Sequence, residues 1–248
     1  MGLFSRWFGK GKLDEPVSHA SLHTDIHSHL IPGLDDGAKS IAASLELVRK
    51  LEWLGFKKLI TTPHVMVDLY RNEPEAILEG AEVLRQAMRE NGIEVRLEAA
   101  AEYKIDEGLP ALLAKGRLLS FGDNYILVEL PYYSPPIDLK EQIFALQSSG
   151  YKPILAHPER YVYWHAEFGK LEELKKTGVF FQLNTISLSG YYSHPTKKIS
   201  EKLIDSGMID FLGSDVHHMQ YFRLLEKAMT EPALKRLIDS GRLLNHQV

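Results

Sequence analysis

The segment TDIHSHLIPGLDDG, residues 24–37, carries two histidines two positions apart, directly after a short apolar lead-in. Two adjacent aspartates and a glycine follow. Side chains alternate between the two faces of a strand, so His27 and His29 share a face if the lead-in is a strand. Such a pair indicates either a face open to water or a bound group that holds both imidazoles.

Six more strand-like runs follow along the chain. The seven runs are residues 24–26, 57–62, 94–101, 125–130, 152–156, 179–183 and 209–214. Helical patterns lie between most of them, at residues 39–54, 74–91, 138–149, 167–177, 195–206 and 219–229, and one short helix is expected within 103–120. Strands that alternate with helices predict an α/β fold with a parallel sheet, either a barrel or an open sheet.

Glycines mark the expected ends of five helices. They are Gly55, Gly92, Gly150, Gly178 and Gly207, each just past a helical pattern, where a left-handed residue commonly ends a helix.

Composition narrows the class of protein. The 248 residues are 44% apolar and 25% charged, as in one globular α/β domain. The net charge of −4 argues against a nucleic-acid binder, which needs positive charge to neutralise phosphates. The absence of cysteine excludes thiolate zinc sites and a cysteine nucleophile. No apolar run approaches the roughly 20 residues of a membrane helix, and we expect a cytoplasmic protein.

The beginning of the chain differs from the rest. We predict an N-terminal extension over residues 1–21 and one domain over residues 22–248. In residues 1–12, MGLFSRWFGKGK, large apolar residues recur four positions apart among positive charges, which is typical of an amphipathic helix at a membrane surface. The alternative is a terminal segment that packs on the domain. The first interpretation places the protein at the inner face of the membrane.

Imidazoles and carboxylates follow six of the seven predicted strands. The carboxyl ends of parallel strands converge on one face of a barrel, where active sites form. These residue types bind zinc, manganese and iron, and a buried carboxylate without a partner is costly. The exception is the strand that ends at Asn184. The predicted metal ligands are His27, His29, Asp36, His64, Glu102, Glu129, His157, Asp215 and His217.

Nine ligands exceed what one ion takes, so two or three divalent ions must share them. Three ions on this set leave a net positive site, which favours an anionic substrate. Metal-bound water is acidified to a pKa of about 7 and becomes a nucleophile, while neighbouring ions hold the attacked and leaving oxygens. Hydrolysis of a phosphate ester by metal-bound hydroxide fits best, and two-metal hydrolysis of an amide is the competing chemistry.

The motifs DIHSH with DDG, TTPH, AEY, LVEL, AHPERY and SDVH, in this order, resemble the PHP (polymerase and histidinol phosphatase) superfamily. Over residues 24–248 they most resemble its bacterial metal-dependent protein tyrosine phosphatases of capsule and exopolysaccharide loci. The resemblance implies a distorted (β/α)7 barrel with three divalent ions, expected to be Mn²⁺, with Fe or Zn as alternatives. It also implies one ion among His27, His29, Glu102 and Asp215, with the other ligands sharing the rest.

The same resemblance implies two phosphate-binding arginines, Arg160 of AHPERY and Arg223. A guanidinium offers a planar fork for phosphate oxygens. Arg223 falls one position late in an ungapped alignment, and a longer N-terminus is a second departure. His218 is expected at the rim. Tyr132, Tyr133, Tyr161 and Tyr163 near strand ends suit either an aromatic leaving group or rim packing.

The resemblance implies as substrate a tyrosine-phosphorylated protein, the membrane tyrosine kinase that controls polysaccharide export. The alternatives are a small-molecule phosphatase such as a histidinol phosphatase, and a barrel that binds metal without catalysis. Filled positions for all nine ligands argue against the last of these. No nucleic-acid partner is expected.

Overall fold

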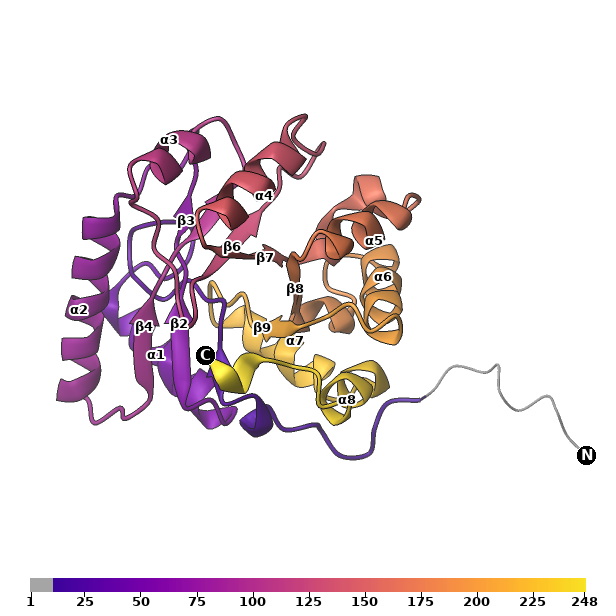
Figure 1. Ribbon diagram of the computed structural model, residues 1–248. Helices are drawn as coiled ribbons and strands as arrows, with labels where there is room; N and C mark the ends of the chain where they lie inside the picture. The colour runs from indigo at the N-terminus through magenta and orange to yellow at the C-terminus, as the bar shows by residue number, and fades with distance from the viewer. Residues whose placement is uncertain (1–10) are drawn as a thin grey trace, which may run out of the picture.

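Parallel strands form the centre of the protein and helices surround them (Figure 1). This computed structural model describes residues 11–248. Neighbouring strands pair in parallel in two sheets, β1–β2–β4 and β3–β5–β6–β7–β8–β9, which confirms the predicted parallel α/β class. The strands are β1 (Thr24–Asp25), β2 (Lys58–Thr61), β3 (His64–Val65), β4 (Arg96–Ala99), β5 (Glu102–Lys104), β6 (Tyr125–Glu129), β7 (Lys152–Ala156), β8 (Phe180–Asn184) and β9 (Phe211–Gly213).

Two of the predicted strands are interrupted. The strands predicted over 57–62 and 94–101 are present as β2 and β4, one or two residues shorter at each end, and after a break each is followed by a second short strand that was not predicted: β3 after β2, and β5 after β4. Pro63 lies in the first interruption and has no amide hydrogen for a ladder. A backbone bond from Glu102 N to Pro63 O, of 3.1 Å, keeps the two broken strands side by side. Counting each broken strand once leaves the seven predicted strand positions.

The outer edges of the two sheets meet beyond β1 and β9. Ser28 and Val216 form a parallel bridge there. On either side of it, Asp215 N donates to His27 O at 2.9 Å and His29 N donates to Val216 O at 3.0 Å. These bonds join the first strand position to the last. The fold is therefore the predicted distorted (β/α)7 barrel.

The helices are α1 (Ile41–Trp53), α2 (Pro74–Glu90), α3 (Leu109–Ala114), α4 (Leu139–Ser148), α5 (Gly169–Lys176), α6 (His194–Asp205), α7 (Gln220–Ala228) and α8 (Pro232–Asp239). Ser40 and Ser193 cap α1 and α6 by accepting a backbone N–H. All five glycines predicted to end helices have positive φ. Helix α8 was not predicted, although Pro232 at its start and Gly241 just past its end are typical helix boundaries.

Part of the predicted N-terminal extension packs on the domain. Leu13 N donates to Thr230 O and Val17 N donates to Met229 O, both at 2.8 Å, so this segment runs beside the turn between α7 and α8. Figure 1 shows it passing near α8. The amphipathic helix predicted in residues 1–12 lies almost entirely outside the described residues, and the division at residue 21 stays a prediction.

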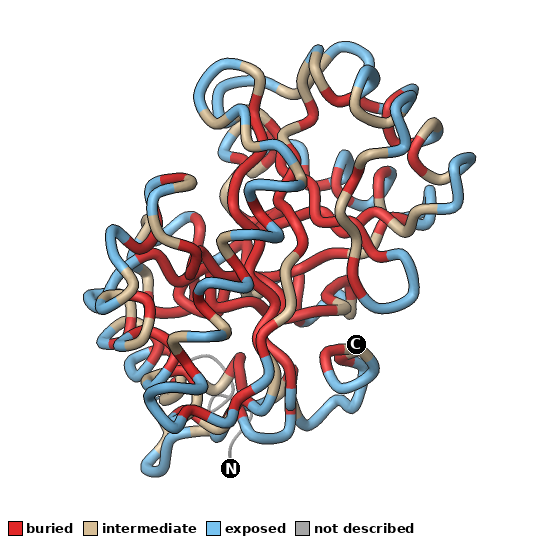
Figure 2. The backbone as a smooth tube through the Cα atoms, turned by 90° about the vertical axis from the view of Figure 1, so that its left-hand side faces the viewer, coloured by how far each residue is buried: buried red, intermediate tan, exposed pale blue. Residues whose placement is uncertain are grey.

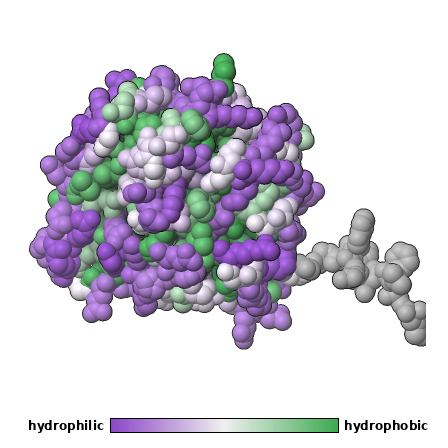
Figure 3. Space-filling view, in the orientation of Figure 1, coloured by the Kyte–Doolittle hydropathy of each residue, from purple (hydrophilic) through white to green (hydrophobic). Residues whose placement is uncertain are grey.

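Apolar side chains fill the space between the strands and the helices. The buried parts of the tube in Figure 2 coincide with the central strands and the inner faces of the helices. Polar residues cover most of the face shown in Figure 3, with apolar patches between them. Within residues 11–248, none of the helices combines the length and the apolar character needed to span a bilayer.

Candidate metal centre

The nine side chains predicted as ligands lie together at the carboxyl ends of the strands. Each has at least one nitrogen–oxygen distance of 3.9 Å or less to another member. Eight are buried, and Asp36 lies exposed at the rim. The structure thus brings together residues that are up to 190 positions apart in the sequence (27 to 217). Their role as metal ligands stays a prediction.

Two of these side chains belong to residues with a strained backbone conformation. His157 follows β7 with φ 36°, and Asp215 follows β9 with φ 52°. Non-glycine residues adopt positive φ uncommonly, and such strain is concentrated at functional sites, where the surrounding structure maintains it. Here it turns each side chain toward the barrel axis directly after its strand.

Glu102 is the hub of the cluster. Its Oε2 lies 3.0 Å from His64 Nδ1, 3.2 Å from His27 Nε2 and 3.6 Å from His29 Nε2. Its other oxygen, Oε1, lies 3.1 Å from His157 Nε2. A single carboxylate therefore faces four imidazoles, an arrangement suited to bridging more than one ion.

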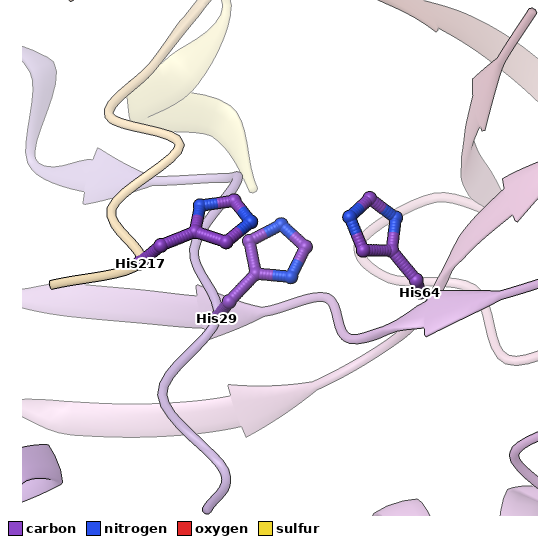
Figure 4. Close-up of side chains that lie close together, drawn as sticks. All are labelled: His29, His64 and His217. Atoms are coloured by element: carbon purple, nitrogen blue, oxygen red, sulfur yellow. The ribbon is translucent and has the colours of Figure 1, made fainter. Parts of the chain in front are cut away.

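Three overlapping groups of ligand atoms have the spacing of metal sites, with all atoms of a group within 4.8 Å of one another. They are His29, His64 and His217; His27, His29 and Asp215; and His64, Glu102 and Glu129. Figure 4 shows the first group, in which the ring of His64 faces the rings of His29 and His217 across a small space. Because His29 and His64 each belong to two groups, the geometry suits several ions that share ligands.

The tautomers of three imidazoles suit metal binding. Their Nδ1 atoms are bound to oxygen acceptors: His27 to Gln182 Oε1 at 2.9 Å, His29 to Asp35 Oδ2 at 2.7 Å and His217 to Asp215 O at 2.9 Å. An imidazole that donates from Nδ1 presents the lone pair of Nε2 on its other side. The Nε2 atoms of His27 and His29 face each other at 3.2 Å.

The buried carboxylates of the cluster favour positive charge beside them. Burial would lower the pKa of His29, but the charge of Asp35 and further hydrogen bonds raise it to about 10. Burial likewise opposes the charge of His64, yet Glu102 and Glu129 raise its pKa to about 12. Burial raises the pKa of Glu102, and the neighbouring His27 and His64 outweigh it and hold that pKa well below the usual range. The buried carboxylates thus keep these imidazoles protonated, and divalent ions would take the place of the protons.

Unpaired buried atoms complete the fit to metal ions. Both carboxylate oxygens of Glu129 and Nδ1 of His64 form no hydrogen bond of good geometry with the described residues, although Glu129 Oε1 lies 3.3 Å from His64 Nδ1. A buried carboxylate without a partner costs several kcal/mol unless a cation compensates it. Imidazole and carboxylate donors together are the set that Mn, Fe and Zn accept. The residues present therefore fit divalent transition metals.

The two aspartates of the DDG sequence have different positions and contacts. Asp36 reaches the cluster from the rim, 3.4 Å from His217 Nε2 and 3.7 Å from His64 Nε2. Asp35, for which no role was predicted, is buried and orients His29. It also accepts hydrogen bonds from the backbone N–H groups of Gly37 and His64, at 2.9 and 3.1 Å. A side chain at Gly37 would collide with the backbone of His29, so only glycine lets this loop fold over the imidazole.

Strand β8, the one strand without a predicted ligand, supplies amides that orient two ligands. Gln182 and Asn184 point to the same side of the strand and bond to each other at 2.9 Å. Gln182 holds His27, and Asn184 Nδ2 donates to Asp215 Oδ2 at 2.6 Å. The sequence signal was present, because two polar residues alternate within an otherwise apolar strand.

A cleft of about 500 Å³ opens over the cluster. Arg160 lines it, with its Nη1 3.3 Å from Asp215 Oδ2. Arg223 is exposed on α7 and is not among the residues that line the cleft, and His218 is exposed beside Tyr221. The prediction for Arg223 therefore gains no geometric support.

The four tyrosines considered in the sequence divide into two kinds. Tyr132 and Tyr133 line the cleft, and Tyr133 is almost fully exposed. Tyr161 is completely buried and accepts from Leu130 N while it donates to Ala156 O, so it is a structural residue. Tyr163 donates to Pro131 O at 3.1 Å.

Comparison with known proteins identifies related sequences. A family model described as "Capsular polysaccharide synthesis, CpsB/CapC" matches residues 23–231. The tyrosine-protein phosphatase YwqE of Bacillus subtilis (strain 168) is 34% identical over 197 residues, which are 79% of this chain and 78% of that protein. The putative tyrosine-protein phosphatase CapC of Staphylococcus aureus is 29% identical over 194 residues, 78% of this chain and 76% of that protein.

Solved structures give the same result. A structure from the work on YwqE of Bacillus subtilis and CpsB of Streptococcus pneumoniae, described as unique metal-dependent tyrosine phosphatases, matches with a TM-score of 0.77 and 31% identity. The match covers 90% of this chain and 94% of that one. An amidohydrolase from Mycoplasma synoviae matches with a TM-score of 0.57 at 16% identity, covers 92% of this chain and 87% of its own, and shows a similar fold.

Proposed function

The chain belongs to the CpsB/CapC family of capsular polysaccharide synthesis, and from this premise we propose that it is a metal-dependent protein tyrosine phosphatase, a phosphoric monoester hydrolase. One observation carries the proposal: eight buried side chains of ligand type converge beside Arg160, and four of them line one cleft together with it. Divalent ions held by these residues, next to a guanidinium, would suit a phosphate dianion. Membership in this family supports the assignment to phosphotyrosine.

The nine ligands would hold three divalent ions, and the resemblance to manganese-dependent phosphatases favours Mn²⁺. The three overlapping groups of ligand atoms support the number of ions. Such ions acidify a water molecule to make it a nucleophile and neutralise phosphate oxygens. Glu102 and Asp215 would keep neighbouring ions close, while Asp35 and Gln182 hold the two histidines of HSH in the tautomer that leaves Nε2 free.

Arg160 would bind the phosphate of the substrate. Its guanidinium faces the cleft beside the cluster, and two parallel N–H groups match two phosphate oxygens. Aromatic rings line the cleft around it, with Tyr70 stacked on His64 and Tyr221 beside His217, both at ring distances of 5.7 Å. These walls suit a flat phenyl leaving group.

Substrate choice tests the proposal. The metal-loaded protein is expected to hydrolyse a phosphotyrosine peptide with a kcat/KM about 100-fold above that for histidinol phosphate, because the cleft places aromatic surface around the leaving group. A phosphoserine peptide serves as the control for peptide binding alone. A preference for histidinol phosphate would contradict the proposal and favour a small-molecule phosphatase of the PHP superfamily.

We further propose that the substrate is a tyrosine-phosphorylated membrane kinase of polysaccharide export, which the enzyme meets at the cytoplasmic face of the membrane through residues 1–12. The apolar and basic composition of that segment supports the contact. Deletion of residues 2–12 spares Leu13 and Val17, which hold the following segment on the domain. The deletion should abolish binding to anionic liposomes and leave peptide hydrolysis unchanged. Equal liposome binding by both forms would refute the membrane contact.

A further inference from the structure

The guanidinium of Arg160 lies between two tyrosine rings. Its Cζ is 4.8 Å from the ring centre of Tyr132 and 4.4 Å from that of Tyr192. Tyr132 follows β6, whereas Tyr192 lies in the turn before α6, so two separate parts of the barrel supply the rings. We propose that Tyr132 and Tyr192 are positioning residues that hold Arg160 ready for phosphate, an inference that rests on the proposed function.

The contacts of Arg160 define which of its edges stays available. Asp215 Oδ2 occupies one edge, 3.3 Å from Nη1, and the rings stack on the guanidinium. The side chain is 21% exposed and lines the cleft, so its remaining N–H groups stay available to an anion that enters the cleft. A guanidinium fixed in advance loses less rotational freedom when it binds an anion.

Both tyrosines are themselves held in place. The hydroxyl of Tyr192 lies 3.4 Å from both Asp215 Oδ2 and Asn184 Nδ2, and Tyr191 packs edge-on against its ring at 5.1 Å. The ring of Tyr132 stacks on that of His157 at 6.3 Å with an interplanar angle of 21°. The arginine is thereby fixed relative to the same residues that form the metal cluster.

Asp215 connects the two halves of the site. Its Oδ1 faces the Nε2 atoms of His27 and His29, at 3.3 and 3.4 Å, while its Oδ2 faces Arg160. The position of the guanidinium relative to the ions is therefore set by one carboxylate on its edge and by two rings on its faces. Loss of a ring would free the arginine without removing any candidate ligand.

A double-mutant cycle tests this role. The variants are Tyr192→Leu, Tyr192→Phe, Arg160→Ala and the combination of Arg160→Ala with Tyr192→Leu. The measurements are kinetics on a phosphotyrosine peptide and calorimetric binding of inorganic phosphate to the metal-loaded protein. Tyr192→Leu should raise both KM and the Kd for phosphate about tenfold, because cation–π contacts of a desolvated arginine are strong. In Tyr192→Phe, which keeps the ring, KM and the Kd for phosphate should stay much closer to the wild-type values.

The effect of Tyr192→Leu should vanish when Arg160 is already alanine, since the tyrosine acts through the arginine. Tyr151→Leu, at the opposite end of β7, is the control for loss of a partly buried tyrosine. An equal loss in the Arg160→Ala background, a loss explained by lower metal content, or unchanged phosphate affinity would overturn the inference. Wild-type protein that binds phosphate but hydrolyses no ester would refute the proposed function alone, and the phosphate cycle would still decide the role of Tyr192.

Discussion

Replacement of Glu102 with glutamine is expected to lower kcat/KM for a phosphotyrosine peptide by about 1,000-fold, with loss of bound metal. The carboxylate lies within 3.6 Å of four imidazole nitrogens, so it contacts more of the candidate ligands than any other member of the cluster does. Glutamine keeps the volume but removes the negative charge and turns an amide N–H₂ toward cations. Metal content by elemental analysis and steady-state kinetics measure the two effects.

Glu98→Gln is the matched control for this substitution. Glu98 lies in β4, just before the same interruption, but it pairs with Lys58 and Arg96 away from the cleft. Glu98 contacts no candidate ligand in these ion pairs and does not line the cleft, so activity and metal content should stay near wild type. Full metal content and turnover in Glu102→Gln would contradict the central place given to this carboxylate.

Replacement of Arg160 with lysine is expected to lower kcat/KM about 100-fold while the metal content stays unchanged. Lysine keeps the charge but has no planar fork for two phosphate oxygens, and its ammonium cannot stack between two rings in the same way. The loss should appear for every phosphate ester, because the phosphate and not the leaving group contacts this side chain. Kinetics on p-nitrophenyl phosphate and on the peptide measure it.

Arg236→Lys is the control for loss of a guanidinium. Arg236 binds Asp205 through two nitrogens on the protein surface and is not among the residues that line the cleft. Its replacement should leave the kinetics unchanged. Wild-type activity in Arg160→Lys would show that the phosphate is bound without this arginine, and a parallel loss of metal would assign it a structural role.

The sequence predicted which of these side chains would lie together, because parallel strands impose one simple rule. A residue that follows a strand must lie at the carboxyl face of the barrel, whatever its distance along the chain. His157 and Asp215 illustrate this. His157 directly follows the end of β7, and a single residue separates Asp215 from the end of β9. The rule gives the location of a side chain but not its neighbours, so it left the division of ligands among ions open.

Loops obey no comparable rule. The DDG turn offered two adjacent carboxylates, and nothing in the spacing showed that Asp35 would be buried against His29 while Asp36 stayed at the rim. Tyr192 lies in a turn that resembles many others, and its contact with Arg160 depends on how α6 packs beside the turn that follows β7. The breaks after β2 and β4 likewise depend on how the sheet bends, although Pro63 was a visible signal for the first.

The most direct test of metal-dependent phosphatase chemistry at this cluster uses metal-stripped protein. Hydrolysis of a phosphotyrosine peptide would be measured before and after addition of manganese, with the His27→Ala/His29→Ala double variant alongside. We predict no turnover without metal, recovery with manganese in the unmutated protein, and no recovery in the double variant. Absence of turnover with any divalent metal, or equal recovery in both proteins, would contradict the account.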